Sequence, residues 1–349
     1  MADTTKIGSE RVVAIDTLRG IAALAVCVFH ITNGKDGYLS DSNILKILGS
    51  YGWLGVEVFF VISGFIIPYA MERGGYTILN IKPFLIKRIL RIDPPYLCTI
   101  LIVLLLNYLS TLLPLYAGNG FTLNLKNLLL HFGYLNGIMN EPWVSPVFWT
   151  LAIEFQFYLV TALSFGFMMH EYKVIRYLFL IVILCADLFF ESQVLFFKYS
   201  SLFCVGMMAF YYHTKMIGRA EFLLSSTVLL LFCHLQLGVL PMIAGLVTLL
   251  ILFVPLKLRV LEFLGMISYS LYLIHIPVGG RIINLSTNFV EQELARSFVA
   301  LGAVGVSVGI SYLFFRLIET PSIKLSKAIK YDRTAEIKEQ VPSLERAAP

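Results

Sequence analysis

The sequence predicts an all-α fold, a polytopic membrane helix bundle of about ten transmembrane helices. Of its 349 residues, 58% are hydrophobic and only 14% are charged, whereas a typical soluble domain has roughly 25% charged residues. The mean hydropathy is +0.80. Apolar runs close to the ~20 residues that a helix needs to cross a bilayer recur along most of the chain. This composition excludes a soluble two-domain enzyme and an intrinsically disordered chain.

The expected helices follow one another with short connections. Asp16 and Arg19 lie inside the first apolar run and no small-residue cleavage site follows it, so this run is expected to remain as a helix. Pro241 leaves the boundary between the seventh and eighth helices open. We expect a membrane domain over residues 1–322 and a charged cytoplasmic tail over 323–349. The ten expected ranges are 13–32, 51–70, 94–116, 145–169, 174–190, 194–212, 222–238, 239–255, 261–280 and 296–318.

Lysine and arginine residues are unevenly distributed between the two sides of the membrane. With the N-terminus in the cytoplasm, the inner segments hold 20 of the 27 basic residues, the outer segments hold six, and Arg19 lies within the membrane. Basic residues favour the cytoplasmic side, so both termini are expected there. The net charge of +5 suits a membrane surface better than nucleic acid. The five cysteines are scattered singly without a Cys-x-x-Cys pair, which excludes a disulfide scaffold.

Ionisable side chains inside the expected helices are candidates for function, because a charge at mid-bilayer costs about 2.5–3.5 kcal/mol on insertion scales. The first helix carries Asp16, Arg19 and His30. Arg19 and His30 are about three helical turns apart, so they share a face and stand roughly 16 Å apart along the axis. Asp16 precedes Arg19 by three residues and is expected to pair with it.

The helix order predicts two levels of titratable groups. An outer level, suited to proton transfer, would combine His30, Glu57, Glu154 and His275. An inner level, suited to binding phosphates, would combine four cations. These are Arg19, Lys87, Arg88 and Arg91.

Five motifs occur in order along about residues 12–320. Arg19 and His30, with ten residues between them, form the first motif. The others are GVEVFFVISGF at 55–65, FLIKRILR at 84–91, WTLAIE at 149–154 and LGMISYSLYLIH at 264–275. As an ordered set they resemble the acyltransferase 3 family of integral membrane O-acyltransferases. In that family Asp more often stands at the position of Glu57 and Ser often at that of Thr150, and both differences keep the chemical type.

This resemblance implies transfer of an acyl group, usually acetyl from acetyl-CoA, to a hydroxyl of a carbohydrate or glycoconjugate at the bacterial inner membrane. The expected partners are the lipid bilayer and a carbohydrate, lipid-linked glycan or other hydroxyl acceptor, with no nucleic acid. The alternative is a transporter or flippase that moves an acyl donor or glycolipid without chemistry, because transporters also contain intramembrane charges. The ordered motifs favour the enzyme.

The expected roles follow from the two levels and from the resemblance. The long arm of coenzyme A would enter from the inner side and deliver the thioester to His30, which would act as general base or as transient acyl carrier. Glu57 or Glu154 would fix the tautomer of His30. The expected catalytic residues are His30, Glu154 and Glu57; the donor-binding residues are Arg19, Arg88 and Arg91; the substrate-binding residues are Trp149, Tyr272 and His275; and Asp16 is the structural partner of Arg19.

Several of these residues also have purely structural interpretations. Asp16 and Arg19 would then form a buried structural ion pair, Arg88 and Arg91 would anchor the chain at lipid headgroups, and Trp149 would be an interfacial anchor. No metal site is predicted, because the six histidines never form His-x-x-x-His and no cysteine lies at zinc spacing. His131, His170 and His213 fall in connections and are expected to be solvated.

Overall fold

The computed structural model describes residues 4–112, 120–190, 192–254 and 258–331. Within these ranges every regular element is a helix, which confirms the predicted all-α fold. The elements, with η for short 3-10 or π segments, are α1 (Thr4–Asn33), α2 (Ile44–Gly49), η1 (Gly52–Leu54), α3 (Gly55–Arg73), η2 (Ile78–Asn80), α4 (Ile81–Thr111), α5 (Leu125–His131), α6 (Phe148–Met168), α7 (Lys173–Phe190), η3 (Phe196–Tyr199), α8 (Ser200–His213), α9 (Arg219–Leu237), α10 (Val239–Leu252), α11 (Arg259–Met266), α12 (Ser268–His275), η4 (Ile276–Gly280), α13 (Arg281–Ser286), α14 (Glu293–Phe314), η5 (Phe315–Glu319) and α15 (Thr320–Ala328).

A helix overlaps each of the ten expected ranges, but fewer helices are long and apolar enough to span a bilayer. Six helical segments of the described chain meet that condition, or seven if the bent pair α11 and α12 counts as one span. The helices α8 and α10 have only 14 residues each, which corresponds to about 21 Å of helix against about 30 Å of hydrocarbon. The structure therefore supports a polytopic helix bundle but does not confirm about ten membrane spans.

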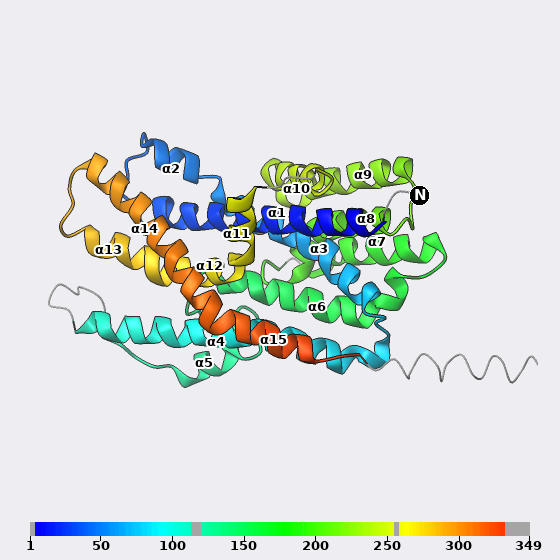
Figure 1. The fold of residues 1–349 in the computed structure, drawn as a ribbon, viewed down its shortest axis with the longest axis horizontal. Coiled ribbons are helices and arrows are strands. Elements are labelled where there is room, and N and C mark those ends of the chain that lie inside the picture. The colour runs from blue at the N-terminus through cyan, green and yellow to red at the C-terminus, as the bar shows by residue number, and fades with distance from the viewer. Residues whose placement is uncertain (1–3, 113–119, 191, 255–257, 332–349) are drawn as a thin grey trace, which may run out of the picture.

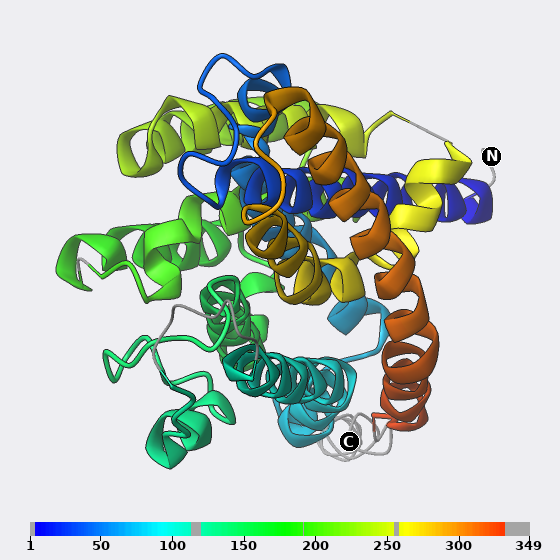
Figure 2. The ribbon, with the colours of Figure 1, turned by 90° about the vertical axis from the view of Figure 1, so that its left-hand side faces the viewer.

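The long helices run side by side along the longest axis of the molecule (Figure 1). Viewed from one end, α9 and α10 lie on one side of the bundle, α4 on another and α14 on a third (Figure 2). The core helix is α8, whose residues from Ser200 to Tyr211 are all buried. Gly64 of α3 and Gly206 of α8 allow these two helices to touch through their backbones. A Cβ at either glycine would collide with a carbonyl oxygen of the opposite helix.

Two irregular segments position polar side chains inside the bundle. The chain bends by 65° between α11 and α12, and α12 then passes into the π segment η4, which contains Pro277. A second π segment, η5, interrupts the run from α14 to α15 and carries Glu319. Such π segments shift the facing of the residues that follow and often occur at functional sites.

The first part of the expected tail is helical. Helix α15 lies along α4 (Figure 1), and the hydroxyl of Ser326 donates to the carbonyl oxygen of Lys87 at 2.8 Å. Helix α1 begins, and α15 ends, toward the same right-hand end of the molecule in Figure 1. Residues 332–349 of the expected tail lie outside the described residues.

Candidate active site

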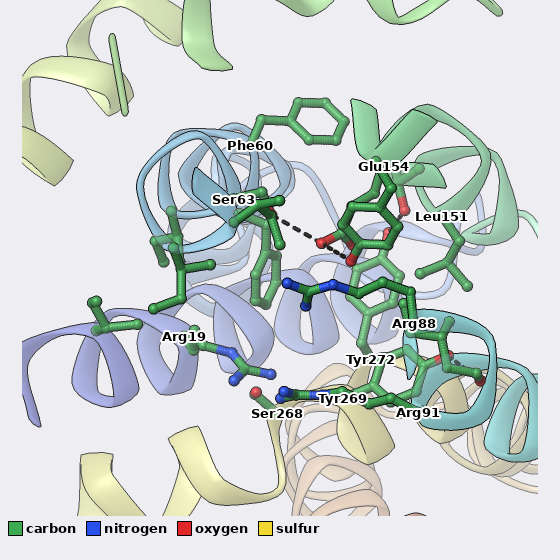
Figure 3. A pocket seen from close by; sticks show the side chains of 18 of the residues that line it. Arg19, Phe60, Ser63, Arg88, Arg91, Leu151, Glu154, Ser268, Tyr269 and Tyr272 are labelled. Atoms are coloured by element: carbon green, nitrogen blue, oxygen red, sulfur yellow. Dashed lines mark hydrogen bonds between the residues drawn. The ribbon is translucent and has the colours of Figure 1, made fainter. Parts of the chain in front are cut away.

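A cavity of about 310 Å³ lies inside the bundle, between α1, α3, α4, α6 and α12. Arg19 of α1 and Arg88 and Arg91 of α4 line this cavity, and Figure 3 shows their guanidinium groups pointing into the same space. We call it the guanidinium cavity. Arg88 and Arg91 project from one face of α4 because they are three positions apart. The structure thus brings together the three residues that were expected to bind the donor.

The three guanidinium groups form no close ion pair in the described part of the chain. No carboxylate oxygen lies within 4.0 Å of Arg19, Arg88 or Arg91. Arg88 lies instead over the rings of Phe84 and Tyr158, with its central guanidinium carbon 5.2 Å from each ring centre. Such cation–π contacts hold the group in place without an ion pair. Since buried charges are normally paired, the cavity suits an anionic ligand.

Two carboxylates also line the guanidinium cavity, and neutral groups hold both of them. Oε1 of Glu154 accepts hydrogen bonds from the Ser63 hydroxyl at 2.9 Å and the Tyr158 hydroxyl at 2.6 Å. Oε2 of Glu319 accepts from the backbone N–H and the hydroxyl of Ser270, at 3.2 and 2.5 Å. These bonds hold one oxygen of each acid in place, and neither acid comes within 4.0 Å of an arginine nitrogen. The guanidinium groups therefore stay available to another anion.

The expected pair of Asp16 and Arg19 makes no close ion pair in the structure. Both residues are described, yet no carboxylate oxygen of Asp16 lies within 4.0 Å of the Arg19 guanidinium. The side chain of Arg19 extends into the cavity toward Arg91 and Ser268 (Figure 3). Asp16 does not line that cavity, and its backbone carbonyl lies against Gly265 of α11.

His30 near the end of α1 and His275 at the end of α12 form an imidazole pair. Nδ1 of His30 lies 3.2 Å from Nε2 of His275 and 3.0 Å from the carbonyl oxygen of Val26. Nδ1 of His275 lies 2.9 Å from the carbonyl oxygen of Leu271. A carbonyl only accepts, so in the neutral pair both Nδ1 atoms carry the proton and Nε2 of His275 is an acceptor. Nε2 of His30 is then left with a free lone pair.

The guanidinium cavity stops short of this imidazole pair. Phe59, Thr150 and Tyr272 line the cavity, whereas His30 and His275 do not. The Tyr272 ring makes an edge contact with Phe59 at 5.8 Å between ring centres, and its hydroxyl lies 2.6 Å from Oγ1 of Thr150. The rings of Tyr272 and His275 are 6.0 Å apart. Tyr272 therefore stands between the guanidinium cavity and the imidazole pair.

The remaining expected site residues lie elsewhere. Glu57 is 6% exposed, its Oε2 has no hydrogen-bond partner, and it does not line the guanidinium cavity. Trp149 packs on the ring of Tyr199 and, with Trp143, lines a separate hollow of about 280 Å³. Of the four groups expected at one outer level, the structure brings only His30 and His275 into contact. No group of three or more histidine, cysteine, aspartate or glutamate residues in the described ranges is placed to hold a metal ion.

Comparison with known protein families identifies the family of this chain. Residues 12–316 match a family described as an acyltransferase domain. This range includes the imidazole pair and every residue that lines the guanidinium cavity except Glu319. The chain belongs to the acyltransferase 3 family. This membership confirms the resemblance that the five motifs predicted. Together with the apolar helices, it supports a membrane-bound acyltransferase.

Individual relatives are more distant and longer. The chain is 27% identical to the O-acetyltransferase OatA of Staphylococcus aureus over 186 residues, which cover 50% of this chain and 28% of that protein. It is 28% identical to the peptidoglycan O-acetyltransferase OatA of Listeria monocytogenes over 168 residues, 46% of this chain and 25% of that one. A putative acetyltransferase of Acidianus two-tailed virus is 30% identical over 147 residues, 42% and 38% of the two chains. The matches thus span less than two fifths of these relatives, and no solved structure matches the chain.

Three polar residues of this acyltransferase 3 site were not singled out from the sequence. Ser63 and Tyr158 hold Glu154, and Glu319 lies one position beyond the last expected helix. A carboxylate directly after a long apolar run was the signal that could have identified Glu319. His131 was expected to be solvated, but it is fully buried, with Nδ1 2.8 Å from the Asn127 carbonyl.

Proposed function

We propose that the chain is a membrane O-acyltransferase of the bacterial inner membrane, with both termini in the cytoplasm. It transfers an acyl group, in the simplest case acetyl, from acyl-CoA to a hydroxyl of a carbohydrate or glycoconjugate. The observation that carries this proposal is the convergence of Arg19, Arg88 and Arg91, without close ion pairs in the described ranges, in a cavity next to an imidazole pair. The family membership supports the reaction class.

The guanidinium cavity suits the anionic part of the donor. Planar guanidinium groups match phosphate oxygens in a bidentate way, and coenzyme A carries several phosphate charges. Three cations against Glu154 and Glu319 leave the cavity with net positive charge. We place the phosphates of the donor at Arg19, Arg88 and Arg91, with the acyl end directed toward Tyr272.

His30 is the proposed general base. Its Nε2 lone pair takes the proton from the acceptor hydroxyl while that oxygen attacks the thioester carbonyl. As the carbon–sulfur bond breaks, the thiolate of coenzyme A leaves and takes this proton from His30, so no proton or electron is left over. His275 accepts a hydrogen bond from Nδ1–H of His30 and so orients the base. The same imidazole is also placed to carry the acyl group transiently.

The roles of the two expected catalytic glutamates differ in this proposal. Glu154 lies in the guanidinium cavity, bonded to Ser63 and Tyr158, and so acts on the donor side rather than on His30. Glu57 is buried and does not line the cavity, and no hydrogen bond joins it to either imidazole in the described residues. We therefore assign the orientation of His30 to His275 in place of either glutamate.

One observation favours a second candidate, binding or transport of the acyl donor without chemistry. The cavity that carries the three arginines does not include His30, so a ligand is able to occupy it without touching the imidazole. A transporter would need the three arginines but would not need His30. The two functions therefore predict different consequences of changing His30.

The test uses purified full-length protein in lipid nanodiscs with radiolabelled acetyl-CoA and a glycan acceptor. We expect His30→Ala to retain acetyl-CoA binding and to reduce labelled product at least about 100-fold, the lower range for loss of a general base. His234→Ala is the matched control, because His234 lies on the exposed surface of α9. Product formation by His30→Ala at the wild-type rate would exclude the proposed base and favour transport.

A further inference from the structure

A second hollow, with several polar side chains in its wall, begins at Ile276, the residue that follows His275 in the chain. Its volume is about 270 Å³, and its polar lining comes from Asn107 of α4, Ser145 before α6, and Arg281 and Asn284 of α13. We call it the Arg281 hollow. The proposed function does not use any of these four residues.

Arg281 supplies a positive charge that the protein does not neutralise. Its two terminal nitrogens donate to the hydroxyl of Ser110, at 2.7 Å, and to the side-chain oxygen of Asn107. Both partners are neutral, and no carboxylate in the described ranges lies within 4.0 Å of Arg281. The two bonds fix the guanidinium group at the wall of the hollow. A single fixed cation of this kind suits one carboxylate on a ligand.

Ser145 adds an unsatisfied hydroxyl to the same wall. Only 1% of this residue is exposed, and its Oγ has no hydrogen-bond partner. A buried polar group without a partner costs about 1–3 kcal/mol, so such groups usually meet a ligand or water. With the amides of Asn107 and Asn284, the hydroxyl gives the hollow both donors and acceptors, as a sugar with several hydroxyl groups requires.

The position of the hollow relates it to the proposed reaction. Ile276 and Pro277, which line the hollow, directly follow His275 in the chain. Pro146, also in its lining, precedes Val147, whose carbonyl oxygen accepts from the Tyr272 hydroxyl at 3.3 Å. The guanidinium cavity therefore reaches Tyr272, and the Arg281 hollow begins at Ile276, about one helical turn further along the chain.

The Arg281 hollow also adjoins a longer space. A neighbouring hollow of about 400 Å³ shares Asn107 and Val144 with it and is lined further by Thr122, Asn124 and Asn127. The two adjoining hollows offer room for more than one sugar ring.

We propose that the Arg281 hollow binds the acceptor, a carbohydrate that carries a carboxylate. Arg281 contacts the carboxylate, and Ser145 and Asn284 contact ring hydroxyls. This inference rests on the proposed acyl transfer, because it assigns the second substrate of that reaction to a hollow separate from the guanidinium cavity.

The test compares two tetrasaccharides with the same backbone, bound to the full chain in nanodiscs. One consists of N-acetylglucosamine alone, and the other alternates N-acetylglucosamine with N-acetylmuramic acid, whose lactyl group adds a carboxylate. We expect the acidic sugar to bind at least tenfold more tightly to the wild type. Arg281→Gln should abolish that difference. If the wild type binds neither sugar, or if Arg281→Gln keeps the preference, the proposal is wrong.

Ser145→Ala keeps the test valid if changes at Arg281 disturb folding. The hydroxyl of Ser145 has no partner in the protein, so its removal should leave thermal stability unchanged or slightly higher and weaken both sugars about fivefold, the value of one hydrogen bond. Ser311→Ala is the matched control, since Ser311 is a fully buried serine with an unpartnered hydroxyl outside the hollow. Unchanged sugar affinity in Ser145→Ala would contradict the site. Acetyl-CoA binding, measured in parallel, separates the two proposals, because its absence in the wild type would overturn the donor site and not the sugar site.

Discussion

Nδ1 of His30 and Nε2 of His275 lie 3.2 Å apart, although 245 positions separate the two residues in the chain. The 65° bend between α11 and α12 and the close approach of α11 to α1 at Gly265 place the end of α12 beside the end of α1. This contact leads to the first prediction. His275 acts through His30 rather than on the substrate.

His275→Ala should lower kcat about 10- to 100-fold with little change in KM for acetyl-CoA, because it removes the acceptor that orients Nδ1–H of His30. His275→Gln should recover part of the activity, since its side-chain amide reaches the position of Nε2 and its oxygen is able to accept the same hydrogen bond. Steady-state kinetics on both variants check this. Equal loss in both variants, accompanied by lower thermal stability, would instead indicate a purely structural role.

The second prediction concerns the shape of the cations in the guanidinium cavity. Arg88→Lys should raise KM for acetyl-CoA about tenfold, because an ammonium group keeps the charge but loses the fork geometry and the stacking on Phe84 and Tyr158. Arg91→Lys should behave similarly. Arg259→Lys, at the exposed first residue of α11, is the control. Wild-type donor affinity in both cavity variants would remove the phosphate assignment.

The third prediction concerns Tyr272 as the barrier between the guanidinium cavity and His30. The proposed reaction requires this ring to turn away, and hydrogen bonds to Thr150 and Val147 hold it in place. Tyr272→Trp should therefore lower kcat at least about tenfold with unchanged donor binding, because a larger ring is harder to displace in a packed interior. Tyr272→Phe should lose much less, since it removes only the restraining hydroxyl. If Tyr272→Trp is as active as Tyr272→Phe, the acyl group takes another path.

The fourth prediction concerns pH and His131, which lies in α5 outside the candidate membrane spans. Burial lowers the pKa of His131 below its usual value. Its neutral ring accepts from the backbone N–H of Val144 at 3.2 Å while Nδ1–H donates to the Asn127 carbonyl. The unfolded loop binds the proton more readily, so the stabilisation is present above about pH 6.5 and is lost as the pH falls below it.

The protection factor of the Val144 amide, which is the intrinsic exchange rate divided by the observed rate, should consequently fall as the pH is lowered from about 7.5 to 5.5. In His131→Leu the protection should be lower at every pH and no longer titrate. A protection factor that follows the same pH curve in wild type and His131→Leu would contradict the assignment.

The sequence predicted the helices and their polar residues much better than the contacts between them. Apolar runs were sufficient for an all-α bundle, and the spacing of Arg88 and Arg91 was sufficient to place both on one face. Spacing also suggested the Asp16–Arg19 pair. Whether the Arg19 side chain points toward that acid or into the cavity depends on the neighbouring helices, which no local pattern reveals. The contact of His30 with His275 likewise depends on the bend between α11 and α12. These two helices have 8 residues each, and their hydropathy does not reveal the bend.

The position of Tyr272 between the guanidinium cavity and the imidazole pair has a consequence for how the two substrates are kept apart. If the reaction proceeds past this ring as proposed, the acetyl group has to move only past one side chain and not across the whole bilayer. Neither the nucleotide nor the glycan then crosses to the opposite compartment. Such a protein exports a two-carbon unit and retains its carrier.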